Sequence, residues 1–240
     1  MSWKNIKTFL IILFLGINIY LLFLTSNASR AKELTDHNIY ETRTVLAKNH
    51  IAINTDIIPR YAVSYETVEL SAYISNETAK NGDISICENI EFDNQTAITV
   101  IKSILKKHGI NTKNIVIKSE GDIYYITENH GNMRLFNNKL TVTQKDGKTN
   151  INGTWFNHKS TDKSKSGEHS GIYATSALIA FISEYNGKET EITDITCGYY
   201  AFTDQSTSNA KSISAVPCYR LTDKKDNVYY YNVLDNSFIE

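Results

Sequence analysis

The feature that most constrains this chain is an unbroken apolar run over residues 8–24, which follows two lysines near the N-terminus. The weakly acidic Tyr20 is the one ionisable side chain in the run. At 1.5 Å of rise per residue, such a run reaches roughly 25 Å as a helix, and two further residues complete the ~30 Å hydrocarbon core of a bilayer. The sequence therefore predicts a transmembrane helix over residues 8–26, after a cytoplasmic tail over residues 1–7.

A basic start followed by apolar residues is also typical of a cleaved signal peptide. Length favours retention, because the apolar part of a signal peptide usually runs for only ~7 to 15 residues. The small residues of Asn27–Ala31 nevertheless have plausible cleavage spacing. Retention predicts a single-pass cell-membrane protein with a cytoplasmic N-terminus, and cleavage predicts a secreted one. In either case the bulk of the chain is extracytoplasmic.

The charged residues argue against one class of partner. The 25 Lys and Arg residues are balanced by 26 Asp and Glu residues, for a formal net charge of -1. Because the charges are interspersed, the chain lacks the basic patch that binds nucleic acid. We expect no DNA or RNA partner.

The three cysteines are too few for a disulfide framework, although one pair can be joined. If consecutive antiparallel strands meet at a loop centred near Thr207, Cys197 lies opposite Cys218 and a cross-strand disulfide can form. A slip of one residue would instead place the two thiols on opposite faces of the sheet, half-buried and free. The sequence leaves both alternatives open.

Apolar periodicity predicts an α+β fold. The helices that we expect cover residues 31–48, 94–108 and 172–185. The strands that we expect cover residues 61–74 (with one slip around Glu66 and Thr67), 114–118, 122–127, 133–136, 139–144, 150–156, 191–202, 213–221, 228–233 and 237–239.

Two local signals refine the predicted strands, and a third divides the chain into two units. Asp146-Gly147 predicts a hairpin turn, and Pro217 predicts an edge strand or a bulge. Residues 158–171 lack bulky hydrophobic side chains and predict an exposed linker. We therefore expect two extracytoplasmic units, 27–157 and 172–240, each with a helix packed on an antiparallel sheet.

The residues that could carry chemistry do not form a recognisable catalytic or metal motif. His158 and His169 flank the polar segment, but no cysteine or carboxylate joins them at ligand spacing. The sequence predicts no enzyme, no cofactor and no metal. The tyrosines of Tyr199-Tyr200 and Tyr229–Tyr231 either form a ligand-stacking surface or cover a sheet.

A polar residue within the apolar run is the stronger functional signal. Asn18 lies near the middle of the run, and Gly16 lies two residues earlier. An amide in hydrocarbon gains from a bond to another helix, and a small residue lets two backbones approach. A local bond within its own helix would also satisfy Asn18, so both interpretations stay open.

Both ends of the chain resemble the YycI proteins of the YycH/YycI family. The N-terminal resemblance rests on Trp3-Lys4, Lys7-Thr8, Phe14-Leu15 and Asn18. The C-terminal resemblance rests on Gly198-Tyr199, Val216-Pro217-Cys218-Tyr219-Arg220 and Tyr229-Tyr230-Tyr231-Asn232-Val233. Tyr219 stands where that family commonly has tryptophan.

This resemblance implies a non-enzymatic bitopic regulator that associates with the WalK (YycG) sensor histidine kinase and a YycH-like protein, in cell-wall homeostasis. We expect Phe14, Gly16, Asn18 and Tyr20 to bind partner helices in the membrane, a second copy of the chain among them. The alternative is an anchored or secreted binding module for a wall polymer or peptide.

Overall fold

The computed structural model of this protein describes residues 13–20, 33–72, 82–158, 169–187, 189–202 and 213–239. Residues 13–20 are helical. The other helices are α2 (Asp36–Lys48), the 3-10 helix η1 (Thr55–Ile57), α3 (Ala97–Lys107) and α4 (Ala174–Glu184).

The described strands form one large sheet and one small one. They are β1 (Ile51–Ile53), β2 (Ser64–Tyr65), β3 (Val68–Ala72), β4 (Asp83–Glu88), β5 (Ile115–Glu120), β6 (Ile123–His130), β7 (Met133–Lys145), β8 (Lys148–Thr154), β9 (Phe156–His158), β10 (His169–Ser170), β11 (Thr190–Phe202), β12 (Ile213–Asp223) and β13 (Val228–Asn232). An eleven-stranded sheet follows the order β4-β8-β7-β11-β12-β3-β9, with β1, β13, β5 and β6 paired off this path. Strands β2 and β10 pair separately.

The α+β class predicted from the sequence is confirmed, but the large sheet is mixed rather than antiparallel. Strand β11 pairs in parallel with β1 at one end and with β7 at the other. These ladders join segments that are far apart in the sequence, so hairpin signals cannot reveal them. The sequence predicts two separate sheets. The parallel contact between β7 and β11 joins their strands into one sheet.

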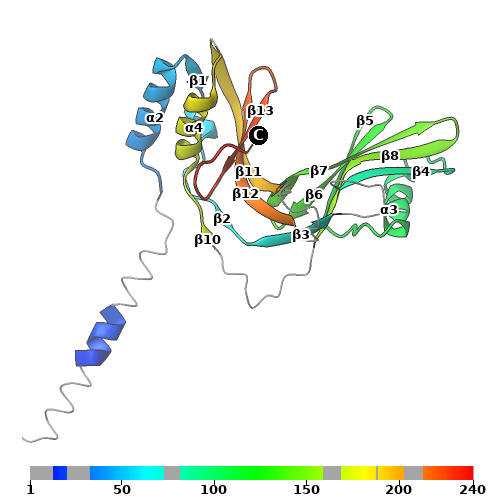
Figure 1. Ribbon diagram of the computed structural model, residues 1–240, viewed down its shortest axis with the longest axis horizontal. Coiled ribbons are helices and arrows are strands. Elements are labelled where there is room, and N and C mark those ends of the chain that lie inside the picture. Colours follow the sequence, from blue (N-terminus) through cyan, green and yellow to red (C-terminus); the bar gives the residue numbers. More distant parts are fainter. Residues whose placement is uncertain are drawn as a thin grey trace, which may run out of the picture.

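Three clusters of buried side chains form the core. The first, the α2–α4 core, packs those two helices on β1, β11, β12 and β13. The second, the α3 core, lies at the far end of the molecule beneath α3 (Figure 1). The third, the junction core, lies between them and consists of Val68, Leu70, Leu135, Phe156, Tyr199, Ala201, Ile213 and Ala215.

The buried clusters draw residues from different parts of the chain. Segment 34–58 shares the α2–α4 core with segment 174–233. The α3 core draws on residues 84–155. At the ends of the predicted linker, β9 pairs with β3 and β10 pairs with β2. Residues 159–168, the middle of that linker, lie outside the described residues.

Helices α2 and α3 confirm two of the predicted helices and show how they begin. The Thr35 hydroxyl accepts a hydrogen bond from the Asn38 amide (3.3 Å) and caps α2. The Asp93 carboxylate accepts from the Thr96 amide (2.8 Å), which orders the turn before α3. Gly109, with φ of 77°, follows the end of α3 in the left-handed conformation expected there.

The strand predictions were confirmed where local periodicity was strong. Strand 61–74 is interrupted at Glu66 and Thr67 as expected, giving β2 and β3. Asp146 and Gly147 join β7 to β8 with φ angles of 52° and 74°, as a hairpin turn of this kind requires. Segments 133–136 and 139–144 are one strand, β7, and strands β1 and β4 were not predicted.

Pro217 corrects a further prediction, because β12 is a central strand of the sheet. On one side of β12 the ladder with β11 runs from Ser214 to Asp223. On the other side β3 pairs with residues 213–215 and β13 with residues 218–222. Pro217 lies in the interval between these two neighbours, and its carbonyl accepts from the Val233 amide (2.9 Å). A missing N–H costs little there.

Candidate functional site

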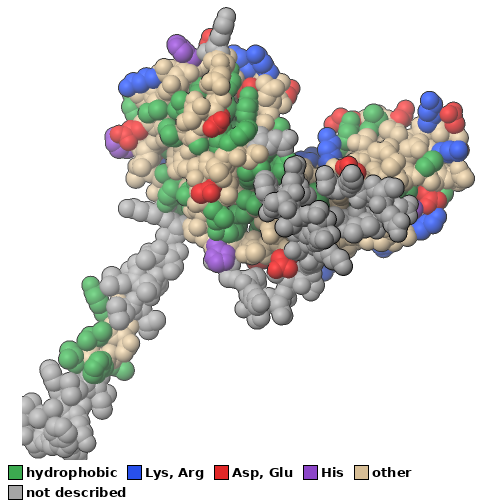
Figure 2. Space-filling model, viewed as in Figure 1, with side chains coloured by type: hydrophobic (Ala, Val, Ile, Leu, Met, Phe, Trp, Pro, Cys, Tyr) green, Lys and Arg blue, Asp and Glu red, His purple; other side chains and the backbone are tan. Residues whose placement is uncertain are grey.

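The helical segment 13–20 carries the residues predicted to bind partners. Every residue of the segment is exposed, with Phe14 and Tyr20 each 62% exposed. It stands away from the folded part of the chain and presents apolar side chains outward (Figures 1 and 2). Among the residues described, no helix has the length and apolarity needed to cross a membrane. The remainder of the predicted span, 8–12 and 21–26, lies outside the described residues.

The Asn18 amide makes a local bond in this segment. Its Nδ2 donates to the carbonyl oxygen of Phe14 (2.9 Å), one turn earlier. One N–H of the side chain is thereby satisfied, which leaves the second N–H and two acceptor sites on Oδ1. The local bond and a bond to another helix are therefore compatible.

The four predicted contact residues divide between two faces of this helix. At 100° per residue, Phe14 and Asn18 share one face, and Gly16 and Tyr20 share the opposite one. Nothing lies within 4 Å of the position that a Cβ on Gly16 would occupy. A single partner helix cannot contact both faces, so binding through all four residues would require two partner helices.

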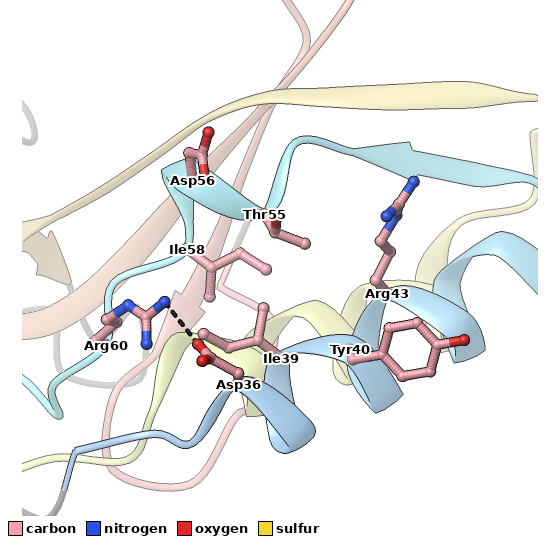
Figure 3. Close-up of a pocket in the computed structure, with 8 residues that line it drawn as sticks. All are labelled: Asp36, Ile39, Tyr40, Arg43, Thr55, Asp56, Ile58 and Arg60. Atoms are coloured by element: carbon pink, nitrogen blue, oxygen red, sulfur yellow. Dashed lines mark ion pairs between the residues drawn. The ribbon is translucent and has the colours of Figure 1, made fainter.

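A hollow of about 450 Å³ lies beside α2, on the part of the fold that follows the apolar segment in sequence. Figure 3 shows Asp36, Tyr40 and Arg43 along α2, with Arg60 and the residues of η1 opposite. Isoleucine side chains from both walls line the space between them. The hollow is therefore apolar at its centre and charged at its rim.

The rim of this hollow is held by ion pairs. Arg60 Nη2 lies 2.8 Å from Asp36 Oδ1, and Arg60 Nη1 lies 4.0 Å from Glu33 Oε1. The hydrogen bond that Arg60 donates to Asp36, together with the charge of Asp36, raises the pKa of Arg60. The Arg60 carbonyl also accepts from the Leu34 amide (2.8 Å). These contacts fix the direction in which the chain enters α2.

A second hollow, of about 260 Å³, lies where β2 meets β6, β7 and β11. The Tyr199 hydroxyl both donates to the Glu66 carbonyl and accepts from the Glu66 amide, each at 3.0 Å. His130 Nε2 lies 3.6 Å from Glu66 Oε2, and its ring meets the Tyr199 ring edge-on at 5.8 Å. Because both bonds of the Tyr199 hydroxyl are to backbone atoms, this cluster holds the interruption between β2 and β3 in place.

The tyrosine-rich strands place their rings on both faces of the sheet. Tyr199 and Tyr231 are almost fully buried, and Tyr229 packs against the α2–α4 core. Tyr200 and Tyr230 alternate with them and lie on the opposite face, with ring centroids 4.9 Å apart. Tyr199, Tyr229 and Tyr231 therefore cover the sheet, as one of the two interpretations expects, and Tyr200 and Tyr230 form a pair of rings on the other face.

Two arginines join the rings of this outer face. Arg220 lies across from Tyr230 in the ladder, and its guanidinium lies 5.2 Å from the centroid of Phe136. Phe136 in turn lies 5.4 Å from Tyr230. Arg134, from the start of β7, pairs with Gly198 beside them. We call Tyr200, Tyr230, Phe136, Arg134 and Arg220 the outer-face cluster.

The cysteine pair follows the second of the two alternatives. In the observed register Cys197 lies opposite Tyr219, and Cys218 lies opposite Gly198. This is a slip of one residue from the pairing that a disulfide requires, so the thiols lie on opposite faces and both are free. Burial raises the pKa of Cys197 to about 12, and it raises the pKa of Cys218 as well. Cys218 is buried and Cys197 is partly buried, and thiols with a raised pKa are of low reactivity.

The two histidines of the polar segment lie in strands. His158 is in β9, and His169 is in β10, where its ring lies 5.5 Å from Tyr65. Within the described parts of the chain, no group of three or more His, Cys, Asp or Glu side chains is placed to hold a metal ion.

Several residues that matter to the structure carried no signal in the sequence for the contacts that they make. Arg134, Arg220, Glu128 and Asn138 acquire their roles only through contacts between distant strands. The alternation of Tyr199 with Tyr200, on a strand that was predicted, was sufficient to separate inner from outer rings.

Comparison with known proteins gives only distant likeness. No protein-family model matches the chain, and no curated protein matches it. The structure is similar to that of an uncharacterized protein from Eubacterium rectale, with 9% identity over 78% of this chain and 89% of that chain and a TM-score of 0.42. It is also similar to the Bacillus megaterium YpeB C-terminal domain, with 11% identity over 87% of this chain and 97% of that one and a TM-score of 0.34.

Proposed function

We propose that this protein is a non-enzymatic membrane regulator that associates with a two-component sensor histidine kinase and modulates cell-wall signalling. The observation that carries the proposal is the helical segment 13–20, whose apolar side chains are exposed and stand apart from the folded part. An exposed apolar helix is stable in a bilayer, where its side chains meet lipid or other helices.

In this proposal residues 8–26 span the membrane once and residues 1–7 are cytoplasmic. The rest of the chain, with its α2–α4 and α3 cores, is extracytoplasmic. The resemblance of both termini to YycI proteins supports a WalK (YycG)-like kinase and a YycH-like sister protein as the partners.

The two faces of the membrane helix suggest how it meets two partners. We assign the face of Phe14 and Asn18 to the kinase, because the Asn18 amide retains a donor and an acceptor for a directional contact. We assign the face of Gly16 and Tyr20 to the sister regulator, because a glycine lets two backbones approach closely.

The mechanism is a population shift. If the helix binds one arrangement of the kinase's transmembrane bundle better than another, the kinase is biased toward that arrangement. A difference of ~1 to 3 kcal/mol in binding free energy corresponds to a bias of about 5- to 150-fold. The hollow beside α2 offers an additional contact close to the membrane.

The test compares substitutions on the two faces in intact cells. Asn18→Leu should reduce co-purification of the kinase and spare the sister protein, whereas Gly16→Leu should do the reverse. Ile19→Leu, between the faces, serves as the control, and all three variants should insert into the membrane. Unchanged association of the kinase with Asn18→Leu would remove Asn18 from the proposal.

A second candidate function, a binding module for a wall polymer or peptide, is favoured by one observation. The rings of Tyr200, Tyr230 and Phe136 lie close together on the outer face of the sheet. If this function is correct, the chain should sediment with purified cell wall and should not co-purify with the kinase.

A further inference from the structure

The outer-face cluster carries more positive charge than its neighbours balance. Arg220 Nη2 lies 3.0 Å from Asp194 Oδ2, and the Arg220 side chain is 25% exposed. No ion pair of Arg134 is found among the described residues. Asp194 therefore balances the charge of Arg220 but not that of Arg134.

The two guanidinium groups are also incompletely hydrogen-bonded. The Nε atoms of Arg134 and Arg220 are both buried and have no acceptor within the described structure. Buried donors in folded proteins nearly always have a partner, so the fold leaves both arginines incompletely compensated. Because both Nε atoms are shielded from solvent, a carboxylate from outside would meet the Nη atoms of the two guanidinium groups. Burial and the nearby charge of Arg220 both lower the pKa of Arg134, as expected for two cations held close together.

The backbone explains why the two arginines meet. Gly198 lies between them in the sheet, paired with Arg134 of β7 and with Cys218 of β12. A Cβ on Gly198 would lie 2.7 Å from the Phe136 ring, so the absence of a side chain lets Phe136 and Arg134 lie over β11. The ring of Phe136 then supports the Arg220 guanidinium from one side.

We propose that the outer-face cluster binds a carboxylate of an acidic peptide segment, presented by a partner protein outside the membrane. A carboxylate matches the planar fork of a guanidinium, and its charge would balance the second arginine. The rings of Tyr200 and Tyr230 flank the arginines and would contact the apolar part of the segment. A partly desolvated site of this kind favours a charged group over a neutral one.

This inference rests on the proposed function for the kind of partner, but its test needs only this chain. The probe is a fluorescein-labelled, N-acetylated hexaglutamate peptide, and the protein is the full chain in nanodiscs of neutral phosphatidylcholine. Hexaglutamine is the matched neutral peptide. Fluorescence anisotropy measures the dissociation constant.

Three variants make the outcome decisive. Arg134→Gln should weaken hexaglutamate binding by about fivefold or more, because it removes the unpaired cation. Asp194→Asn should tighten binding by about threefold, because it removes the competing carboxylate. Lys118→Gln, at an exposed position of β5, makes the same charge change outside the cluster and should leave binding unchanged.

Tighter binding by Asp194→Asn cannot result from loss of the fold, so this variant keeps the test valid if Arg134→Gln is unstable. Equal binding by Arg134→Gln and the unmodified chain, or equal loss in Lys118→Gln, would overturn the proposal. Competition by inorganic phosphate at concentrations where free glutamate is ineffective would also overturn it. Failure here with kinase association intact would leave the proposed function standing.

Discussion

Two adjacent asparagines, Asn137 and Asn138, hold the junction between the two larger cores. The Asn137 side chain bonds both the amide and the carbonyl of Ala201, each at 2.8 Å. The Asn138 side chain does the same for Phe156, at 2.8 and 3.0 Å. Each side-chain amide therefore makes the pair of hydrogen bonds that a neighbouring strand backbone would make. It does so at a point where that backbone has been displaced.

The displacement is a bulge in β7 opposite β6. Thr127 pairs with Lys139, but the next residue, Glu128, pairs with Leu135. Asn138 Nδ2 also donates to Glu128 Oε2 (2.6 Å), and Glu128 is only 4% exposed. Burial raises the pKa of Glu128 to about 7, although the bond from Asn138 opposes the shift. A carboxyl group that titrates near neutral pH therefore lies at the junction.

Glu128→Gln tests this carboxyl group. Because the folded-state pKa lies above that of the unfolded chain, the folded chain binds more protons between pH 4.5 and 7 and loses stability as the pH rises through that range. From pH 5 to pH 8 the unmodified chain should lose about 2 kcal/mol of unfolding free energy relative to Glu128→Gln. Denaturant unfolding of the full chain in detergent micelles measures the difference.

The control for this titration is Glu120→Gln, at the exposed end of β5. Its stability should follow that of the unmodified chain at every pH. Parallel pH profiles for Glu128→Gln and the unmodified chain would show that Glu128 does not cause the loss.

At the scale of elements, the contact between β7 and β11 decides how the two larger cores are joined. This ladder is parallel and has only two residue pairs, Gly198 with Arg134 and Tyr199 with Leu135. A Cβ on Gly198 would lie 2.4 Å from the Arg134 carbonyl oxygen, which is closer than real contacts allow. The approach of the two strands therefore depends on a glycine at this position.

Gly198→Ala should destabilise the chain by about 1 to 3 kcal/mol, because the backbone of β7 must move away from β11. Gly121→Ala is the matched control. It lies in the turn between β5 and β6 with a φ of 61° and no atom within 4 Å of its Cβ position, so it should cost only about 1 kcal/mol of backbone strain. Midpoints of denaturant unfolding compare the two. A larger cost for Gly121→Ala would argue against a tight approach of β7 to β11.

The sequence predicted elements well where their signals are local. The stripe of α3, the glycine after it and the Asp146-Gly147 turn are all confirmed, since each depends on residues a few positions apart. Strand β4 was missed although Ile84 and Ile86 alternate with polar residues, and β1 has only three residues. The parallel ladders could not be predicted, because they depend on packing between distant segments.

The candidate site was predictable to the same extent. The apolar run fixed Phe14, Gly16, Asn18 and Tyr20 as candidates, and helical geometry then divides them into two faces. The outer-face cluster required the register of β11, β12 and β7, which differs by one residue from the register first expected for the cysteine pair. A shift of that size changes which side chains share a face.

At the scale of the whole molecule, the apolar helical segment 13–20 lies apart from the folded part of the chain (Figure 1). We propose that the two faces of the helix make contacts within a bilayer, and the folded part has the hollow beside α2 and the outer-face cluster. In our account the chain regulates by binding through these surfaces, with the membrane helix as the principal one.

Photo-crosslinking in intact cells tests this account most directly. A photoreactive phenylalanine analogue replaces Phe14, and the sensor histidine kinase carries an epitope tag. We predict a covalent adduct between the two proteins in the membrane fraction, and its loss when Asn18→Leu is added. An absence of kinase adducts from position 14, together with mature protein in the culture fluid that begins near Arg30, would contradict the account.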